Sequence, residues 1–238
     1  MADADGICGC ASLSINHEKK IGVVHSFLVE PNQRGSGIGK LLWQKLHERA
    51  RTHGLEALVL DADPNAVKYD IGLNIDAEEV DRLDLSLDCI EAISADPELK
   101  DWQGFGVVVQ AYQKRAPFVL DCLADMGKRH GRRFMVRLVK GAYWDAEVKR
   151  AQELGLPGYP VYTRKANTDV SYLACAKKLF EDTDVFYPQL ATHNAHSIAS
   201  VMEFAGNNRD FEFQRLHGMG EELYEHVVET DKVGVGCR

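Results

Sequence analysis

The stretch RRFMVRLVKGAYW, residues 132–144, decides how this chain is expected to fold. Its middle, residues 134–139, is apolar and β-prone apart from one arginine, which is typical of a buried strand in a parallel sheet. That arginine, Arg137, needs a partner, because an unpaired guanidinium in a protein core is costly. A cation, a glycine and two aromatic residues follow the strand directly, and this combination suits a flat, anionic ligand. A structural salt bridge would also explain Arg137, but the recurrence of similar strand ends elsewhere favours a ligand contact.

The composition indicates a globular protein and argues against several function classes. The chain has 238 residues, 45% of them hydrophobic and 27% charged, with a net charge of −8, which disfavours a nucleic-acid or membrane surface. There is no apolar run long enough to span a bilayer and no signal-peptide pattern. The six cysteines lack metal-ligand spacing, so we expect reduced thiols, no metal site and a cytoplasmic location.

Five apolar runs share one arrangement, in which polar residues follow each run directly. They cover residues 71–75, 105–109, 134–139, 185–191 and 211–216, and stripes at helical spacing separate them. Strands alternating with helices predict parallel βα units. Polar clusters at the carboxyl ends of successive strands are typical of a (β/α)8 barrel, whereas a doubly wound open sheet concentrates its site at one switch point. We therefore predict an α/β fold, an incomplete (β/α)8 TIM-type barrel of about five βα units.

The first part of the chain has a different organisation. Residues 21–29 and 55–60 read as strands, and a glycine-rich turn with a helical run lies between them. Backbone N–H groups of such a turn can converge on phosphate oxygens at the positive end of the helix. This frame resembles the GCN5-related N-acetyltransferases, whose pyrophosphate loop is matched by Arg34, Gly37 and Gly39. The resemblance implies that amides near Gly35, Gly37 and Gly39 hold acetyl-CoA in a partial GNAT-like α/β segment, residues 1–67, which lacks the family's acceptor site.

Long motifs in the second part match another family in one order. They are NIDAEE at residues 74–79, VQAYQKR at 109–115, RLVKGAYW at 137–144, YPVYTRK at 159–165 and ATHNAH at 191–196. Together they resemble the proline dehydrogenase domain of the bifunctional proline-utilisation A flavoenzymes, over residues 68–238. The resemblance implies an FAD-dependent oxidation of L-proline to 1-pyrroline-5-carboxylate, with hydride transfer to flavin N5.

The same resemblance implies a role for individual residues. Arg137 would lie near the flavin N5 edge, and Gln110 would hydrogen-bond the isoalloxazine. Tyr143 and Leu216 would pack on the substrate, and Asp76 would face it and pair with a lysine of the preceding strand. Asp76, Arg137 and Tyr143 are thus the catalytic candidates. The remaining cofactor-binding candidates are Lys140, Gly141, Ala142 and Trp144 along the cofactor, Thr163, Lys165 and Thr168 at its ribityl, phosphate or adenosine portions, and Thr192, His193 and Asn194 at its far end.

Parts of that family's pattern have no counterpart in this sequence. The first two strands are missing, with the lysine expected to pair with Asp76, and so is the helix whose arginine pair binds the proline carboxylate. Since a bidentate arginine clamp orients a substrate, we expect a truncated fragment of low activity. An acetyl-CoA-dependent N-acetyltransferase module and a non-catalytic truncated fusion product are the alternatives. The sequence leaves open whether the protein forms a homo-oligomer and whether a complementing chain supplies the arginines.

Overall fold

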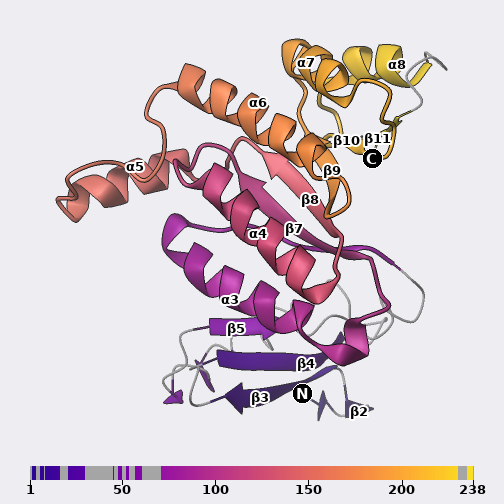
Figure 1. Ribbon diagram of the computed structural model, residues 1–238. Helices are drawn as coiled ribbons and strands as arrows, with labels where there is room; N and C mark the ends of the chain where they lie inside the picture. Colours follow the sequence, from indigo (N-terminus) through magenta and orange to yellow (C-terminus); the bar gives the residue numbers. More distant parts are fainter. Residues whose placement is uncertain are drawn as a thin grey trace. The chain divides into compact units, whose positions relative to one another are not determined.

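The computed structural model describes residues 2–3, 6–7, 9–16, 21–29, 45, 48–49, 52–53, 57–60, 71–229 and 235–237. The chain divides into two compact units, Met1–Tyr69 and Asp70–Arg238 (Figure 1). This division lies close to the boundary between residues 67 and 68 that the sequence motifs predict.

The first unit contains a three-stranded mixed sheet. Strand β4 (Ile21–Val29) pairs with β3 (Gly9–Asn16) in antiparallel fashion and with β5 (Ala57–Leu60) in parallel. A second, two-stranded antiparallel sheet joins β1 (Ala2–Asp3) to β2 (Gly6–Ile7). The predicted strand at residues 21–29 is confirmed, and the one predicted at 55–60 begins at Ala57. The glycine-rich turn lies outside the described residues.

The second unit is built on six strands in one parallel sheet, in the order β11-β10-β9-β8-β7-β6. The strands are β6 (Leu73–Ile75), β7 (Phe105–Gln110), β8 (Phe134–Val139), β9 (Phe186–Ala191), β10 (Glu212–Gln214) and β11 (Gly236–Cys237). Neighbours in the sheet are neighbours in the sequence, as repeated βα units require. The predicted α/β class with a parallel sheet is confirmed.

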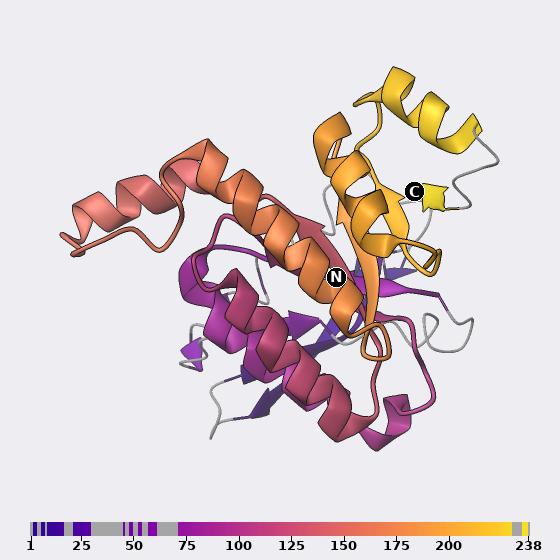
Figure 2. The ribbon, with the colours of Figure 1, turned by 45° about the horizontal axis from the view of Figure 1, so that its top comes forward.

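Helices connect these strands. They are η2 (Val80–Arg82), α3 (Leu83–Ser94), η3 (Pro97–Leu99), α4 (Ala116–His130), α5 (Trp144–Glu153), α6 (Lys165–Glu181), α7 (Ala195–Ala205) and α8 (Glu221–Glu229). Helices α3, α4 and α6 lie side by side on one face of the sheet (Figures 1 and 2). Among the described residues, no helix combines the length and the apolar character needed to cross a membrane.

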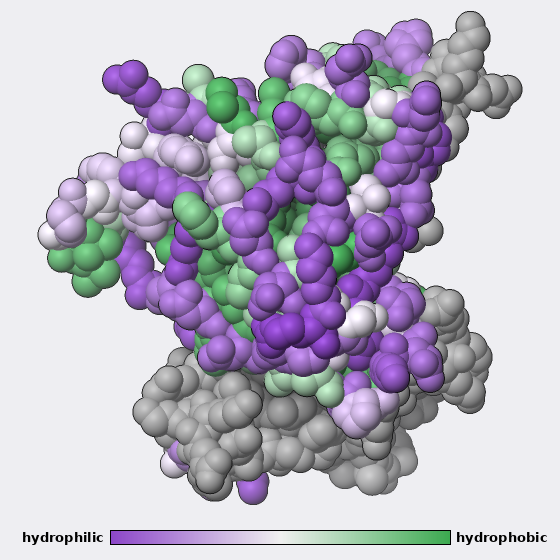
Figure 3. All heavy atoms as spheres, viewed as in Figure 1, coloured by the Kyte–Doolittle hydropathy of each residue, from purple (hydrophilic) through white to green (hydrophobic). Residues whose placement is uncertain are grey.

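Strand β8 separates the two faces of the sheet. Phe134, Val136 and Leu138 are fully buried, while the alternate residues Met135, Arg137 and Val139 are half-buried. Because side chains alternate along a strand, the first set faces the helices and the second faces away from them. Seen from the helix side, the surface of the second unit is largely hydrophilic, with hydrophobic patches at the tip of α5 and between the helices (Figure 3).

The face away from the helices is concave. The side-chain amide of Asn74 on β6 donates to Gln189 on β9 at 2.7 Å, although two strands lie between them. Strands about 4.8 Å apart in a flat sheet would put these backbones about 14 Å from each other, so the sheet must curl. Gly106 on β7 leaves room for this contact, because a Cβ there would lie 1.8 Å from Asn74 Oδ1. Curling of this kind is what the strands of a barrel require.

Candidate functional site

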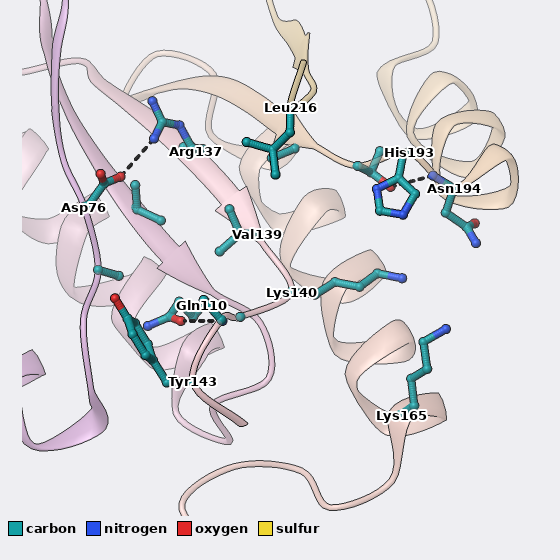
Figure 4. Close-up of a pocket in the computed structure, with 16 residues that line it drawn as sticks. Asp76, Gln110, Arg137, Val139, Lys140, Tyr143, Lys165, His193, Asn194 and Leu216 are labelled. Carbon is teal, nitrogen blue, oxygen red and sulfur yellow. Dashed lines mark hydrogen bonds and ion pairs between the residues drawn. The ribbon is translucent and has the colours of Figure 1, made fainter. Parts of the chain in front are cut away.

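A cavity of about 590 Å³ opens at the carboxyl ends of the strands, on the concave face (Figure 4). Carboxyl ends of parallel strands meet at one edge of a sheet, so polar residues that follow different strands come together there. The sequence candidates that line it are Asp76, Gln110, Arg137, Lys140, Gly141, Ala142, Tyr143, Lys165, Thr192, His193, Asn194 and Leu216. Its volume falls within the range of about 300–1,000 Å³ that is usual for ligand sites.

Three candidates do not line the cavity. The indole of Trp144 is half-exposed and donates to the carbonyl of Tyr162 at 2.9 Å. Thr163 is exposed, and Thr168 is buried in α6. The lining residues that were not predicted are Ala77, Val108, Val139 and Ala191. A sequence signal existed for Val139, which lies two residues after Arg137 on the same strand and so on the same face.

Arg137 has two partners on the concave face. Its Nη1 donates to Asp76 Oδ1 at 2.9 Å and its Nε donates to Gln214 Oε1 at 2.7 Å. The partner of Asp76 is therefore Arg137, where the sequence comparison had led us to expect a lysine. Asp76 is 77% exposed and the Arg137 side chain 32%, so the guanidinium is reachable from the cavity. Arg137 therefore forms the structural salt bridge that the sequence analysis considered, here with Asp76, and it also lines the cavity.

Gln110, at the end of β7, ties two other strand ends together. Its Nε2 donates to the carbonyl of Glu78 at 2.7 Å, and its Oε1 accepts from the backbone N–H of Ala142 at 3.2 Å. The side chain is 4% exposed. Gln110 therefore fixes the segments that follow β6 and β8, while each of its polar atoms keeps capacity for one more hydrogen bond.

Gly141 forms a wall of the cavity that no larger residue could form. Its φ is +133°, and a Cβ there would lie 2.4 Å from the ring of Tyr112. Tyr112 is buried, and burial raises the pKa of its hydroxyl to about 12. The ring is therefore a neutral, fixed surface against which the backbone of Gly141 passes.

Lysine residues gather on the other side of the cavity. Lys140 Nζ lies 2.5 Å from Asp169 Oδ1 and 5.9 Å from the centre of the Tyr172 ring, and Lys165 lies 4.0 Å from the same carboxylate. The hydrogen bond from Lys140 lowers the pKa of Asp169. Figure 4 shows Lys140, Lys165 and His193 on the side of the cavity away from Asp76 and Arg137.

The amino end of α7 opens on that same side. Asn194 caps the helix, because its Oδ1 accepts from the backbone N–H of Ser197 at 3.0 Å, and Thr192 Oγ1 accepts from the N–H of Asn194 at 3.1 Å. A helix amino end carries partial positive charge. Together with the two lysines it makes this side of the cavity suited to an anion.

Comparisons with known proteins agree on one family. A family model described as Proline dehydrogenase matches residues 17–238. The bifunctional protein PutA of Klebsiella aerogenes is 63% identical over 166 residues, which is 68% of this chain and 13% of that protein. The bifunctional protein PutA of Escherichia coli strain K12 is 61% identical over 174 residues, which is 72% of this chain and 13% of that protein. This chain therefore spans about 13% of the length of these curated relatives.

A solved structure agrees with these relatives. The structure described as proline utilization A (PutA) with proline bound in remote sites has 56% sequence identity and a TM-score of 0.71, and it covers 73% of this chain and 18% of that one. The sheet and helices of the second unit therefore match the proline dehydrogenase barrel of PutA.

A weaker match is to an acetyltransferase. An IAA acetyltransferase of Azospirillum brasilense is 36% identical over 55 residues, which is 23% of this chain and 36% of that protein. This coverage is too small to show a second family, and the proline dehydrogenase match itself begins at residue 17. The acetyltransferase interpretation of residues 1–67 stays a prediction.

Proposed function

This chain belongs to the proline dehydrogenase family, and we propose that it acts as an FAD-dependent proline dehydrogenase that oxidises L-proline to 1-pyrroline-5-carboxylate. The observation that carries the proposal is one cavity lined by residues at or just after the carboxyl ends of five strands. The curled, sequentially ordered sheet supports the finer proposal that residues 68–238 are an arc of a (β/α)8 barrel.

FAD is a flat ring system joined to an anionic diphosphate, and the cavity offers groups for both. Lys140, Lys165 and the amino end of α7 would hold the anionic portion, as the charges on that side favour. Gly141 and Ala142 would let the backbone approach the cofactor closely. The contacts proposed for Thr163, Thr168 and Trp144 have less support, because these residues do not line the cavity.

When bound, FAD would supply the acceptor for the hydride that leaves proline. The chain's own groups would bind and orient. Arg137 would present a fixed positive charge, which favours an electron-rich neighbour. Tyr143 and Leu216 would cover the substrate, and Leu216 is 73% exposed although apolar, as expected of a residue that packs on a ligand. Asp76 would hold the Arg137 guanidinium in position through the ion pair with its Nη1 atom.

The experiment is to purify the chain, measure bound flavin by its visible absorbance and add L-proline without oxygen. Proline-dependent bleaching is the expected result. Arg137→Met should slow the bleaching at least about tenfold, by loss of a charged contact worth about 1.5–3 kcal/mol. Lys149→Met, which alters an exposed lysine of α5, is the matched control and should bleach like the parent chain. Flavin that binds tightly but never bleaches with proline would contradict the proposed reaction.

A second candidate function concerns the first unit alone. Residues 30–56 connect the parallel strands β4 and β5, and Lys45, Glu48, Arg49 and Thr52 within them are helical. A strand, a crossover containing a helix and a parallel strand form a unit compatible with an acyl-CoA-binding module. We propose acetyl-CoA as its ligand, held near Arg34, Gly35, Gly37 and Gly39. A rise in melting temperature that saturates with acetyl-CoA and is lost in Gly37→Val would support this. An unchanged melting temperature would refute it.

A further inference from the structure

A continuous network of hydrogen-bonded polar side chains crosses the concave face and ends at Arg137 in the cavity wall. Asn74 Nδ2 donates to Gln189 Oε1 at 2.7 Å, and Gln189 Nε2 donates to Glu212 Oε1 at 2.9 Å. Gln214 Nε2 donates to the same Glu212 oxygen at 2.7 Å, and Arg137 Nε donates to Gln214 Oε1 at 2.7 Å. The hydrogen-bonded network thus runs from β6 through β9 and β10 to the guanidinium on β8.

Glu212 is the anionic member of this network and is its most buried residue. It is 2% exposed, and Gln189 beside it is 4% exposed. A buried carboxylate is costly unless hydrogen bonds satisfy it, and here two side-chain amides donate to one of its oxygens. The sheet register places Arg137, Gln189 and Glu212 in one row across adjacent strands. Such a buried carboxylate aligned with the site arginine calls for a role beyond packing.

The order of donors and acceptors shows what Glu212 does. A side-chain amide has one donating end and one accepting end, an ionised carboxylate only accepts, and a guanidinium only donates. Glu212 takes the NH2 end of Gln214, so the carbonyl end of Gln214 must face Arg137. If the amide turned over, its NH2 group would face the guanidinium and its oxygen would face the carboxylate. Both contacts would then be repulsive, so Glu212 sets the direction of the amide.

We propose that Glu212 is a positioning residue for Arg137 and acts through Gln214. Gln214 holds Nε of the guanidinium while Asp76 holds Nη1, so the plane of the group is fixed at two points. With the site empty or filled, the group then stands ready in one orientation, which lowers the cost of binding a ligand. The benefit for catalysis rests on the proposed function, in which Arg137 meets the flavin.

The direct test is nuclear magnetic resonance of the full chain with 15N-labelled arginine, observing the Nε–H signal of Arg137. Loss of one signal in Arg137→Lys assigns it. We expect slow exchange of this proton with water in the parent chain and fast exchange in Glu212→Gln and in Gln214→Met. The control Glu203→Gln, an exposed glutamate of α7, should leave the signal unchanged. A folded Glu212→Gln chain with the parent's slow exchange overturns the proposal.

A swap of the two side chains guards against simple misfolding. In Glu212→Gln/Gln214→Glu the carboxylate accepts directly from Arg137, and the new glutamine donates to it and accepts from Gln189. Net charge and composition are unchanged, and slow exchange should return. Fast exchange in a folded double variant would also overturn the proposal.

An FAD titration separates this inference from the proposed function. If the parent chain binds FAD, Gln214→Met should weaken binding about tenfold, and much less when Arg137 is already methionine, since coupled residues are not additive. Equal weakening in both backgrounds would refute action through Arg137. If the parent chain binds no FAD while the exchange pattern holds, the proposed function fails and the positioning stands.

Discussion

At the scale of single residues, the site depends on positions where backbone geometry and space leave one choice. Gly141 combines a left-handed backbone with a ring 2.4 Å from where a Cβ would lie. Arg137 could be singled out from the sequence, since a charge inside an apolar run is visible there. Its partners could not, because Gln214 and Asp76 lie 77 and 61 positions away, and only the sheet register decides which residues meet.

We predict that Gly141→Ala damages both stability and the site. The new methyl group would collide with Tyr112, and the backbone would keep a φ that alanine adopts with strain, so unfolding should become easier by about 2–4 kcal/mol. Flavin content should fall as the wall moves. Urea unfolding and visible absorbance measure the two effects.

Gly158→Ala is the control for this prediction. No atom lies within 4 Å of a Cβ at Gly158, and its φ is not in the left-handed range. That variant should therefore match the parent chain in both measurements. Equal losses at the two positions would contradict the role given to Gly141.

At the scale of elements, periodicity predicted most of the second unit. Strands β6 to β9 fall inside the predicted runs or within one residue of them, because buried strands of a parallel sheet are continuous apolar runs. Strand β10 covers only residues 212–214 of the run predicted at 211–216, and its polar residues Glu212 and Gln214 belong to the network on the concave face. Strand β3 was missed although Ala11, Leu13 and Ile15 alternate with polar residues. That two-residue period is the signal for a half-buried strand.

Arg132 holds one of these elements in place. The basic run at residues 128–133 suggests cations at a helix end, and Lys128 and Arg129 do occupy the last turn of α4. Arg132, however, follows the helix, is 4% exposed and donates to the carbonyls of Ser94, Asp96, Leu99 and Trp102. Its guanidinium thus ties the segment between α3 and β7 to the start of β8.

We predict that Arg132→Met lowers the free energy of unfolding by about 3 kcal/mol, because buried carbonyl groups lose their charged donor. Denaturant unfolding measures the loss. Arg129→Met is the control, since Arg129 pairs at the surface with Glu91 and Asp125, and surface pairs contribute little. If Arg129→Met lowered the free energy of unfolding as much as Arg132→Met, the buried hydrogen bonds of Arg132 would not explain the loss.

At the scale of the whole molecule, topology assembles the site. The predicted site residues of the second unit lie between residues 76 and 216, and the sequence states neither their distances nor their mutual orientation. It does state that they follow successive parallel strands, which was enough to predict that they meet at one edge. The lysine-rich side, by contrast, depends on α6 lying close enough for Asp169 to reach Lys140. The spacing of motifs in the sequence does not predict helix packing of this kind.

Ion pairs that join distant elements also set how the molecule responds to acid. Hydrogen bonds from Arg129 and His130 lower the pKa of Glu91 from its ordinary 4.5, and the hydrogen bond from Lys140 lowers that of Asp169 from 3.8. A carboxyl group with a lowered pKa in the folded state stabilises that state fully above its ordinary pKa, and the contribution is lost as the pH falls through the lowered value. Stability at neutral pH therefore contains a contribution from both pairs, and it should decline below about pH 4.5.

We predict that Glu91→Gln/Asp169→Asn is less stable than the parent chain at pH 7 and loses less stability on acidification. The two stability curves should converge as the pH falls through the lowered pKa values of Glu91 and Asp169, because the parent's carboxylates then become protonated while the variant has none to protonate at these sites. Urea unfolding midpoints at closely spaced pH values measure this. The single variants should each show part of the effect and sum to the whole, since Glu91 on α3 and Asp169 on α6 share no partner. Parallel curves for parent and double variant would mean that other carboxyl groups govern the acid response.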